Sequence, residues 1–166
     1  MYTLKPLSRD GIPAALRKAE RYRLLNDPWE AESICRDILS VDAENQDALV
    51  ILILALTDQF AAEGSEMEAA RLLLPRLQGE YRRAYYAGII YERRAKKLLQ
   101  LRPPGTDAIV YEALRQAMAL YEEAERLRPP GEDDPLLRWN SCARLLMKHE
   151  QVRPVPLDPH TEHPLE

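Results

Sequence analysis

The chain has 166 residues, a formal net charge of −4, and a hydrophobic content of 46%. This length and composition suit one domain with a real core. The acidic balance argues against a dedicated nucleic-acid binder, and the longest apolar run, residues 48–56, is too short to cross a bilayer. The N-terminal residues carry no apolar stretch typical of a signal peptide, so we expect a cytoplasmic protein with no membrane partner.

Helix-forming residues dominate the composition, whereas the alternating pattern of β-branched residues that is typical of strands is missing. The sequence therefore predicts an all-α protein. After an extended lead-in over residues 1–10, the predicted helices cover about 11–25, 29–40, 46–63, 65–74, 79–101, 107–127 and 133–149.

Proline and glycine mark the boundaries between these helices. Asp27 can cap the second helix, with Pro28 at its first position. Ser65, followed by Glu68, forms a capping box for the fourth helix. The segments 102–105 and 128–131 both read Arg-Pro-Pro-Gly and stop the fifth and sixth helices.

Pro75 conflicts with the fourth predicted helix, because a proline inside a helix costs about 3 kcal/mol. The fourth helix therefore either stops or kinks there. A third alternative is that the fifth helix begins at Pro75.

The last part of the chain, residues 150–166, is rich in proline and acidic side chains. Neither a helix nor a core fits this composition, so we expect a disordered tail. The helical domain is then confined to residues 11–149. Because the tail is acidic, one hypothesis is that it transiently occupies a basic groove of that domain, and the alternative is that it only keeps the protein in solution.

Small and aromatic residues recur at fixed spacings in two of the predicted helix pairs. The first pair carries Ala19, Tyr22, Ala31, Cys35, Ile38 and Ala43, and the later pair carries Gly88, Tyr91, Ala117, Tyr121, Ala124 and Pro129. Small residues let two helices approach closely, and an aromatic ring fills the space beside them.

This spacing resembles that of the tetratricopeptide repeat. Segments 82–88 and 137–144 are also similar to a bacterial tetratricopeptide family without an assigned activity. The resemblance implies a short solenoid of about three helical hairpins and a capping helix over residues 11–149, with the first helix of each hairpin lining a concave groove. The middle hairpin departs from the pattern, since Ile53 and Leu56 replace the small and aromatic residues.

Motifs that carry chemistry are missing from the sequence. It has no phosphate-binding or dinucleotide-binding glycine pattern and no H-E-x-x-H zinc motif. His160 and His163 form the only histidine pair and lie in the proline-rich tail, which is a poor place for a metal. Cys35 and Cys142 are expected to be reduced core thiols. We therefore expect no catalytic, cofactor or metal site, and we expect that the protein is not an enzyme.

The fifth predicted helix is the basic part of an acidic protein, with seven basic residues against two acidic ones between Glu80 and Arg102. One interpretation is a solvated face paired with neighbouring acids, and the other is a site for an acidic peptide. Together with the resemblance, the second interpretation gives a set of candidate partner-binding residues: Arg23, Arg82, Tyr85, Tyr86, Ile89, Arg93, Lys97, Asn140, Arg144 and Lys148.

The function expected from these features is a scaffold or adaptor that binds another protein or an acidic peptide in a partly basic groove. One alternative is a chaperone for an assembling or secreted client. Another is a regulatory subunit or a small enzyme whose site the motifs do not reveal. Nucleic acid is disfavoured as a partner, and association into a homo-oligomer is left open.

Overall fold

The computed structural model describes residues 2–60 and 65–154. The described residues contain α-helices and two 3₁₀ turns but no strand, which confirms the predicted all-α class. In chain order the helices are α1 (Ile12–Leu24), α2 (Pro28–Val41), α3 (Gln46–Asp58), α4 (Ser65–Leu73), α5 (Glu80–Leu101), α6 (Asp107–Leu127) and α7 (Asp134–Lys148).

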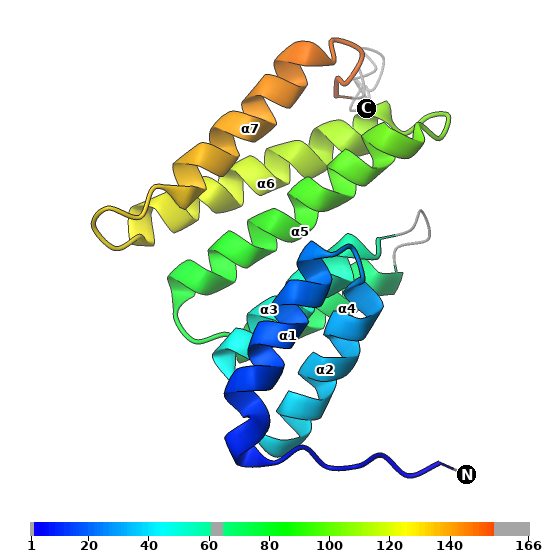
Figure 1. Cartoon of the computed structure of the whole chain (residues 1–166). Coiled ribbons are helices and arrows are strands. Elements are labelled where there is room, and N and C mark those ends of the chain that lie inside the picture. Colours follow the sequence, from blue (N-terminus) through cyan, green and yellow to red (C-terminus); the bar gives the residue numbers. More distant parts are fainter. Residues whose placement is uncertain (1, 61–64, 155–166) are drawn as a thin grey trace, which may run out of the picture.

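Each helix packs mainly against the helices that precede and follow it in the chain. The shorter helices α1 to α4 form one group, and the long antiparallel pair α5 and α6 lies beside it and carries α7 (Figure 1). Helices that are two apart in the chain also pack together, namely α1 with α3 and α3 with α5. In Figure 1, α1 belongs to the lower group of helices and α7 lies at the top, with α5 and α6 between them.

Local side-chain chemistry explains where the early helices begin. Asp27 caps α2 as predicted, accepting a 3.4 Å hydrogen bond from the Glu30 backbone N–H. Asn45 caps α3 in the same way, with a 3.0 Å bond from the Ala48 N–H to its Oδ1. Each cap satisfies a backbone donor that the first turn of a helix leaves without a partner.

The structure differs from the sequence prediction at the ends of α3 and α4. The third helix ends at Asp58 rather than near residue 63, and residues 61–64 lie outside the described part of the chain. The fourth helix ends at Leu73 and continues as a 3₁₀ turn over Leu74–Arg76. Pro75 therefore stops the helix rather than kinking it, since it cannot donate the backbone hydrogen bond that an α-helix needs. The predicted Ser65 cap involves a side chain that the structure does not describe.

Both Arg-Pro-Pro-Gly segments end a helix, as predicted. Arg102 leaves α5 in the left-handed conformation with a φ of 48°. Gly105 and Gly131 turn the chain with φ values of 76° and 83°, a region that glycine adopts without steric cost.

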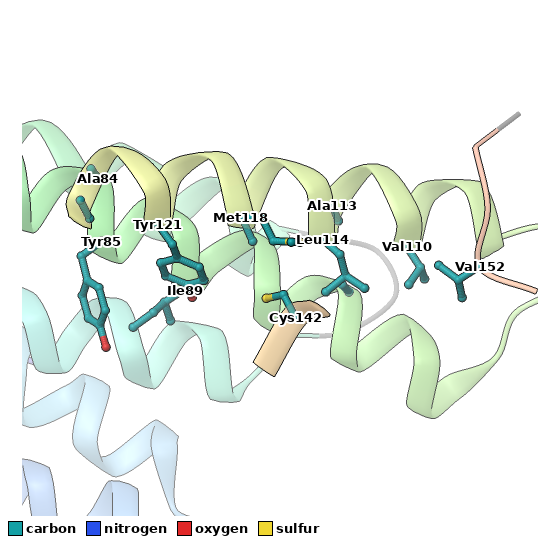
Figure 2. Close-up of a cluster of buried hydrophobic side chains, with 13 residues drawn as sticks. Ala84, Tyr85, Ile89, Val110, Ala113, Leu114, Met118, Tyr121, Cys142 and Val152 are labelled. Atoms are coloured by element: carbon teal, nitrogen blue, oxygen red, sulfur yellow. The ribbon is translucent and has the colours of Figure 1, made fainter. Parts of the chain in front are cut away.

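The largest cluster of buried side chains lies between α5, α6 and α7 (Figure 2). At its centre, the fully buried ring of Tyr121 lies against Gly88. A Cβ atom at position 88 would stand only 2.6 Å from Cε1 of that ring. The glycine is thus required by the close approach of α6 to α5, which is the packing reason for the small residue seen in the sequence.

A second cluster joins the early helices to the start of this hairpin. It contains Leu49, Ile53 and Phe60 from α3 and its end, together with Ile90 of α5. The half-buried rings of Tyr86 and Tyr91 contact both clusters. The two groups of helices are therefore joined by apolar packing as well as by the chain.

The chain remains packed for a few residues beyond α7. The Val152 side chain is buried beside Val110, and its N–H donates a 2.9 Å bond to the His149 carbonyl (Figure 2). The first residues of the predicted tail are thus part of the helical body, because one apolar side chain finds room at the end of the α5–α6 pair. The rest of the tail, residues 155–166, lies outside the described residues.

The contact at position 88 gives a first prediction. An exposed helical Gly→Ala change stabilises a protein by up to about 1 kcal/mol. We expect Gly88→Ala instead to lower the free energy of unfolding by about 1–3 kcal/mol, because the Tyr121 ring cannot move aside. Urea denaturation measures the loss. In a Tyr121→Leu background the added methyl group has room and should cost little, so an equal loss in both backgrounds would contradict this assignment.

Candidate functional site

A basic cavity of about 300 Å³ opens between the end of α3, the middle of α5 and the start of α7. It is lined by Thr57, Asp58, Arg93, Lys96, Lys97, Gln100 and Arg138. We call this set the basic cavity. Four of its residues are cations and only one, Asp58, is an acid.

The helix α5 supplies the long polar wall of the cavity. Its residues Arg93, Lys96, Lys97 and Gln100 follow one another at intervals of three, one and three residues. Residues at this spacing share one face of an α-helix. The opposite face of α5 carries buried residues such as Gly88 and Ala95, so burial of that face directs the polar face into the cavity.

Asp58 joins three helices at one edge of the cavity. Its Oδ2 accepts a 2.6 Å bond from Nε of Arg23 on α1, and its Oδ1 pairs with the Arg93 guanidinium on α5. These side chains are only 18–25% exposed, so water screens the ion pairs less than it would on an open surface.

The second acidic group near the cavity is the fully buried carboxylate of Glu92. Its Oε2 accepts a 2.5 Å hydrogen bond from the Tyr121 hydroxyl of α6. Its Oε1 pairs with the Lys96 ammonium and, at 3.3 Å, with Nη1 of Arg138 on α7. Because a buried charge is tolerated only when it is paired and hydrogen-bonded, these contacts are a condition of the fold.

Burial and the Glu92 charge shift the pKa values of the groups around that carboxylate. Burial and then the nearby carboxylate raise the pKa of Tyr121 far above its ordinary value, so its hydroxyl keeps its proton and donates. Burial alone would lower the pKa of Arg138, but Glu92, Tyr85 and Tyr121 together outweigh burial and raise it. Arg138 therefore stays positively charged at the cavity wall.

The charge balance of this region is strongly positive. Arg23, Arg93, Lys96, Lys97 and Arg138 make five cations around two carboxylates, Asp58 and Glu92, which leaves three positive charges in excess. A concave surface with one sign of charge and low-dielectric walls concentrates ions of the opposite sign. The arrangement can thus hold an anionic group such as a carboxylate.

The structure distributes the candidate partner-binding residues over several places. Arg93 and Lys97 line the basic cavity, and Arg23 reaches its edge through Asp58. Asn140 lines a different cavity on α6 and α7, and neither Arg144 nor Lys148, both exposed on α7, lines the basic cavity.

Among the remaining candidates, Ile89 and Tyr85 belong to the core. Ile89 is 2% exposed and Tyr85 is 9% exposed, and both belong to the cluster of α5, α6 and α7 (Figure 2). Tyr86 packs edge-on against the Tyr85 ring, with centroids 5.2 Å apart, and Arg82 lies half-buried one turn earlier. The tyrosines thus serve packing between helices in this structure, because α5 is covered on the side that they occupy.

Sequence reasoning left Lys96, Gln100 and Arg138 out of the candidate set, although they line the basic cavity. The helical spacing from Arg93 could have found the first two. Arg138 carries no such signal, because its position depends on how α7 crosses α5. The role of Glu92 also depends on tertiary structure, since Tyr121 is 29 residues away in the chain.

Other kinds of site find no support in the described residues. Among residues 2–60 and 65–154, no three His, Cys, Asp or Glu side chains lie close enough together to hold a metal ion. Within the same ranges, no helix is long and apolar enough to cross a membrane. Burial raises the pKa values of Cys35 and Cys142 to about 12, so both thiols stay protonated and unreactive.

Comparison with known proteins adds no relative. No family model, no curated protein and no solved structure matches the chain.

The buried carboxylate yields a second prediction. We expect Glu92→Gln to lower the free energy of unfolding by about 2–3 kcal/mol, because the amide keeps the shape but loses the charge that Lys96 and Arg138 neutralise. Urea denaturation measures this loss. Lys97→Met is the control, since that lysine lines the cavity without pairing with Glu92, and its effect should stay within about 0.5 kcal/mol. Similar losses in the two variants would refute the role given to Glu92.

A third prediction concerns alkaline pH. In the unfolded chain, tyrosine ionises near pH 10, whereas the folded protein holds the Tyr121 proton to a higher pH. Above about pH 10 the folded state therefore binds more protons, and the free energy of unfolding should fall as the pH rises. Tyr121→Phe should lower stability at pH 8 but flatten this alkaline slope. Urea denaturation between about pH 8 and pH 11 tests this, and an unchanged slope in the variant would contradict it.

Proposed function

We propose that the protein is an interaction scaffold that binds an acidic segment of another protein in the basic cavity. The observation that carries this proposal is the excess of three positive charges around a concave space of about 300 Å³. The internal carboxylates neutralise only part of the charge, so an external anion gains Coulomb energy on entering the cavity.

The arrangement of the helices supports this proposal. Helices α1 and α3 contact each other, as do α3 and α5, and Asp58 joins all three through Arg23 and Arg93. In a tetratricopeptide stack, the first helices of successive hairpins lie side by side in this way and line the binding groove. The small residues at Ala19 and Gly88 are the sequence features that favour such a stack.

The cations of the cavity suit the carboxylates of aspartate, glutamate or a chain terminus. Arg93 and Arg138 present planar guanidinium groups that can pair with a carboxylate through two hydrogen bonds. Lys97 contributes a compact charge on a flexible stem. Since each partly exposed ion pair contributes less than about 1 kcal/mol, several contacts are needed and binding should weaken with salt.

A fourth prediction tests the place of binding. Fluorescence anisotropy with a labelled glutamate-rich peptide measures affinity at low salt. We expect Lys97→Glu to weaken binding about fivefold to tenfold, because it converts an attraction inside the cavity into a repulsion. Lys148→Glu makes the same charge change on α7 outside the cavity lining and should change affinity less than about twofold. Equal effects would show that overall charge, rather than the cavity, attracts the peptide.

The same pair of variants identifies a natural partner. A protein that the wild type and Lys148→Glu both retain from a lysate, and that Lys97→Glu releases, is bound through the cavity. If Lys97→Glu retains the same proteins as the wild type does, the proposal is contradicted. Recovery of a small molecule in place of a protein would favour a regulatory subunit or an enzyme.

A further inference from the structure

A second cavity, of about 350 Å³, lies between α6 and α7, and its charged lining residues are acidic rather than basic. It is lined by Glu122 and Glu125 of α6 and by Leu136, Trp139 and Asn140 of α7. The Trp139 indole donates a 2.9 Å hydrogen bond to Oε1 of Glu122, which holds the ring as one wall. We call this set the acidic cavity.

The helix α7 exposes apolar side chains in the acidic cavity and next to its lining residues in the chain. Leu136 is 37% exposed and the neighbouring Leu137 is 59% exposed. Among the described residues, α7 packs chiefly against α6. The cavity therefore combines carboxylates with apolar surface, which is a surface suited to an amphipathic basic helix.

The first helix of the same protein offers such a surface. On α1 the side chains of Arg17, Lys18 and Arg21 are exposed against a single acid, Glu20. None of these three cations forms an ion pair with another described residue. The helix ends in exposed apolar residues, since Leu24 is 77% and Leu25 is 65% exposed. We call this the basic face of α1.

The two surfaces also match in length and position. With 13 and 15 residues, α1 and α7 are about 20 and 22 Å long at 1.5 Å per residue. In Figure 1, α5 and α6 lie between the two helices. One copy therefore cannot satisfy its own surfaces, whereas two copies can bring one pair of complementary surfaces together.

Electrostatics selects between the ways in which two copies could meet. Pairing two α7 ends would oppose the carboxylates of Glu122 and Glu125 to their own copies, and pairing two α1 ends would oppose cations. Like charges across an interface cost free energy, whereas opposite charges steer association. Only the contact of α1 with the acidic cavity brings opposite charges together.

We infer that the basic face of α1 docks in the acidic cavity of a second copy of this chain. Arg17 and Arg21 then face Glu122 and Glu125, and the Leu24–Leu25 end covers apolar surface of α7. Because the two surfaces differ, a pair of copies retains one unused surface of each kind, the acidic cavity on one copy and α1 on the other. Such a head-to-tail contact grows into open chains unless its rotation closes a ring.

Two charge-reversed variants test this inference. In the first, Glu122→Lys and Glu125→Lys disable the acidic cavity, and in the second, Arg17→Glu and Arg21→Glu disable α1. Sedimentation velocity at low salt should show wild-type species that grow beyond two copies with concentration, and each variant alone should be monomeric. In an equimolar mixture, the wild-type α1 of one variant meets the wild-type acidic cavity of the other, and the two reversed surfaces also carry opposite charges, so the mixture should associate again.

Glu123→Lys is the matched control, because it reverses an exposed charge on α6 that does not line the cavity. It should leave the association constant within about threefold of the wild-type value. Glu125→Lys alone should lower the association constant at least about tenfold. Raising the salt concentration to about 0.5 M should lower it by a similar factor. Circular dichroism checks that the variants stay helical. If a double variant unfolds, the single variant and the salt series decide.

Three results would overturn the inference: a wild-type protein that stays monomeric at every concentration, association that both charge-reversed variants leave unchanged, or a variant mixture that does not associate. The basic cavity takes no part in this contact. Peptide binding and self-association can therefore fail independently of each other.

Discussion

The carboxylate of Glu92 is the group on which the C-terminal half of the protein depends. It is fully buried, and α6 and α7 each send a side chain to it, Tyr121 and Arg138. A charge in this position is tolerated only with its complete set of donors, so α5, α6 and α7 must pack in one specific arrangement. Apolar packing alone leaves more freedom, since side chains of similar volume can exchange places.

The same network links the stability of the fold to the chemistry of the basic cavity. Lys96 and Arg138 pair with the Glu92 carboxylate, and both side chains also line the cavity. Their positions are therefore defined before any ligand arrives, which lowers the entropy that binding would otherwise cost. Asp58 orients Arg23 and Arg93 at the other edge in the same manner.

Charge is distributed unevenly along the series of helices, so the two ends of the series differ in charge. Cations are concentrated on the outer face of α1 and around the basic cavity, and carboxylates line the acidic cavity on α6 and α7. A net charge of −4 conceals this pattern completely. The surfaces with which the protein can meet other molecules are therefore defined by the order of the helices rather than by overall composition.

The sequence by itself determined the helical class and most helix boundaries, because caps and breakers such as Asp27 and Arg102–Gly105 act on their immediate neighbours. It also identified α5 as basic, since helical spacing places Arg93 and Lys97 on one face. Only the tertiary structure decided that Ile89 and Tyr85 face the core while Arg138 lines the cavity. It also decided that Glu92 is buried beside Tyr121, because such contacts join residues far apart in the chain, and their geometry depends on how whole helices cross.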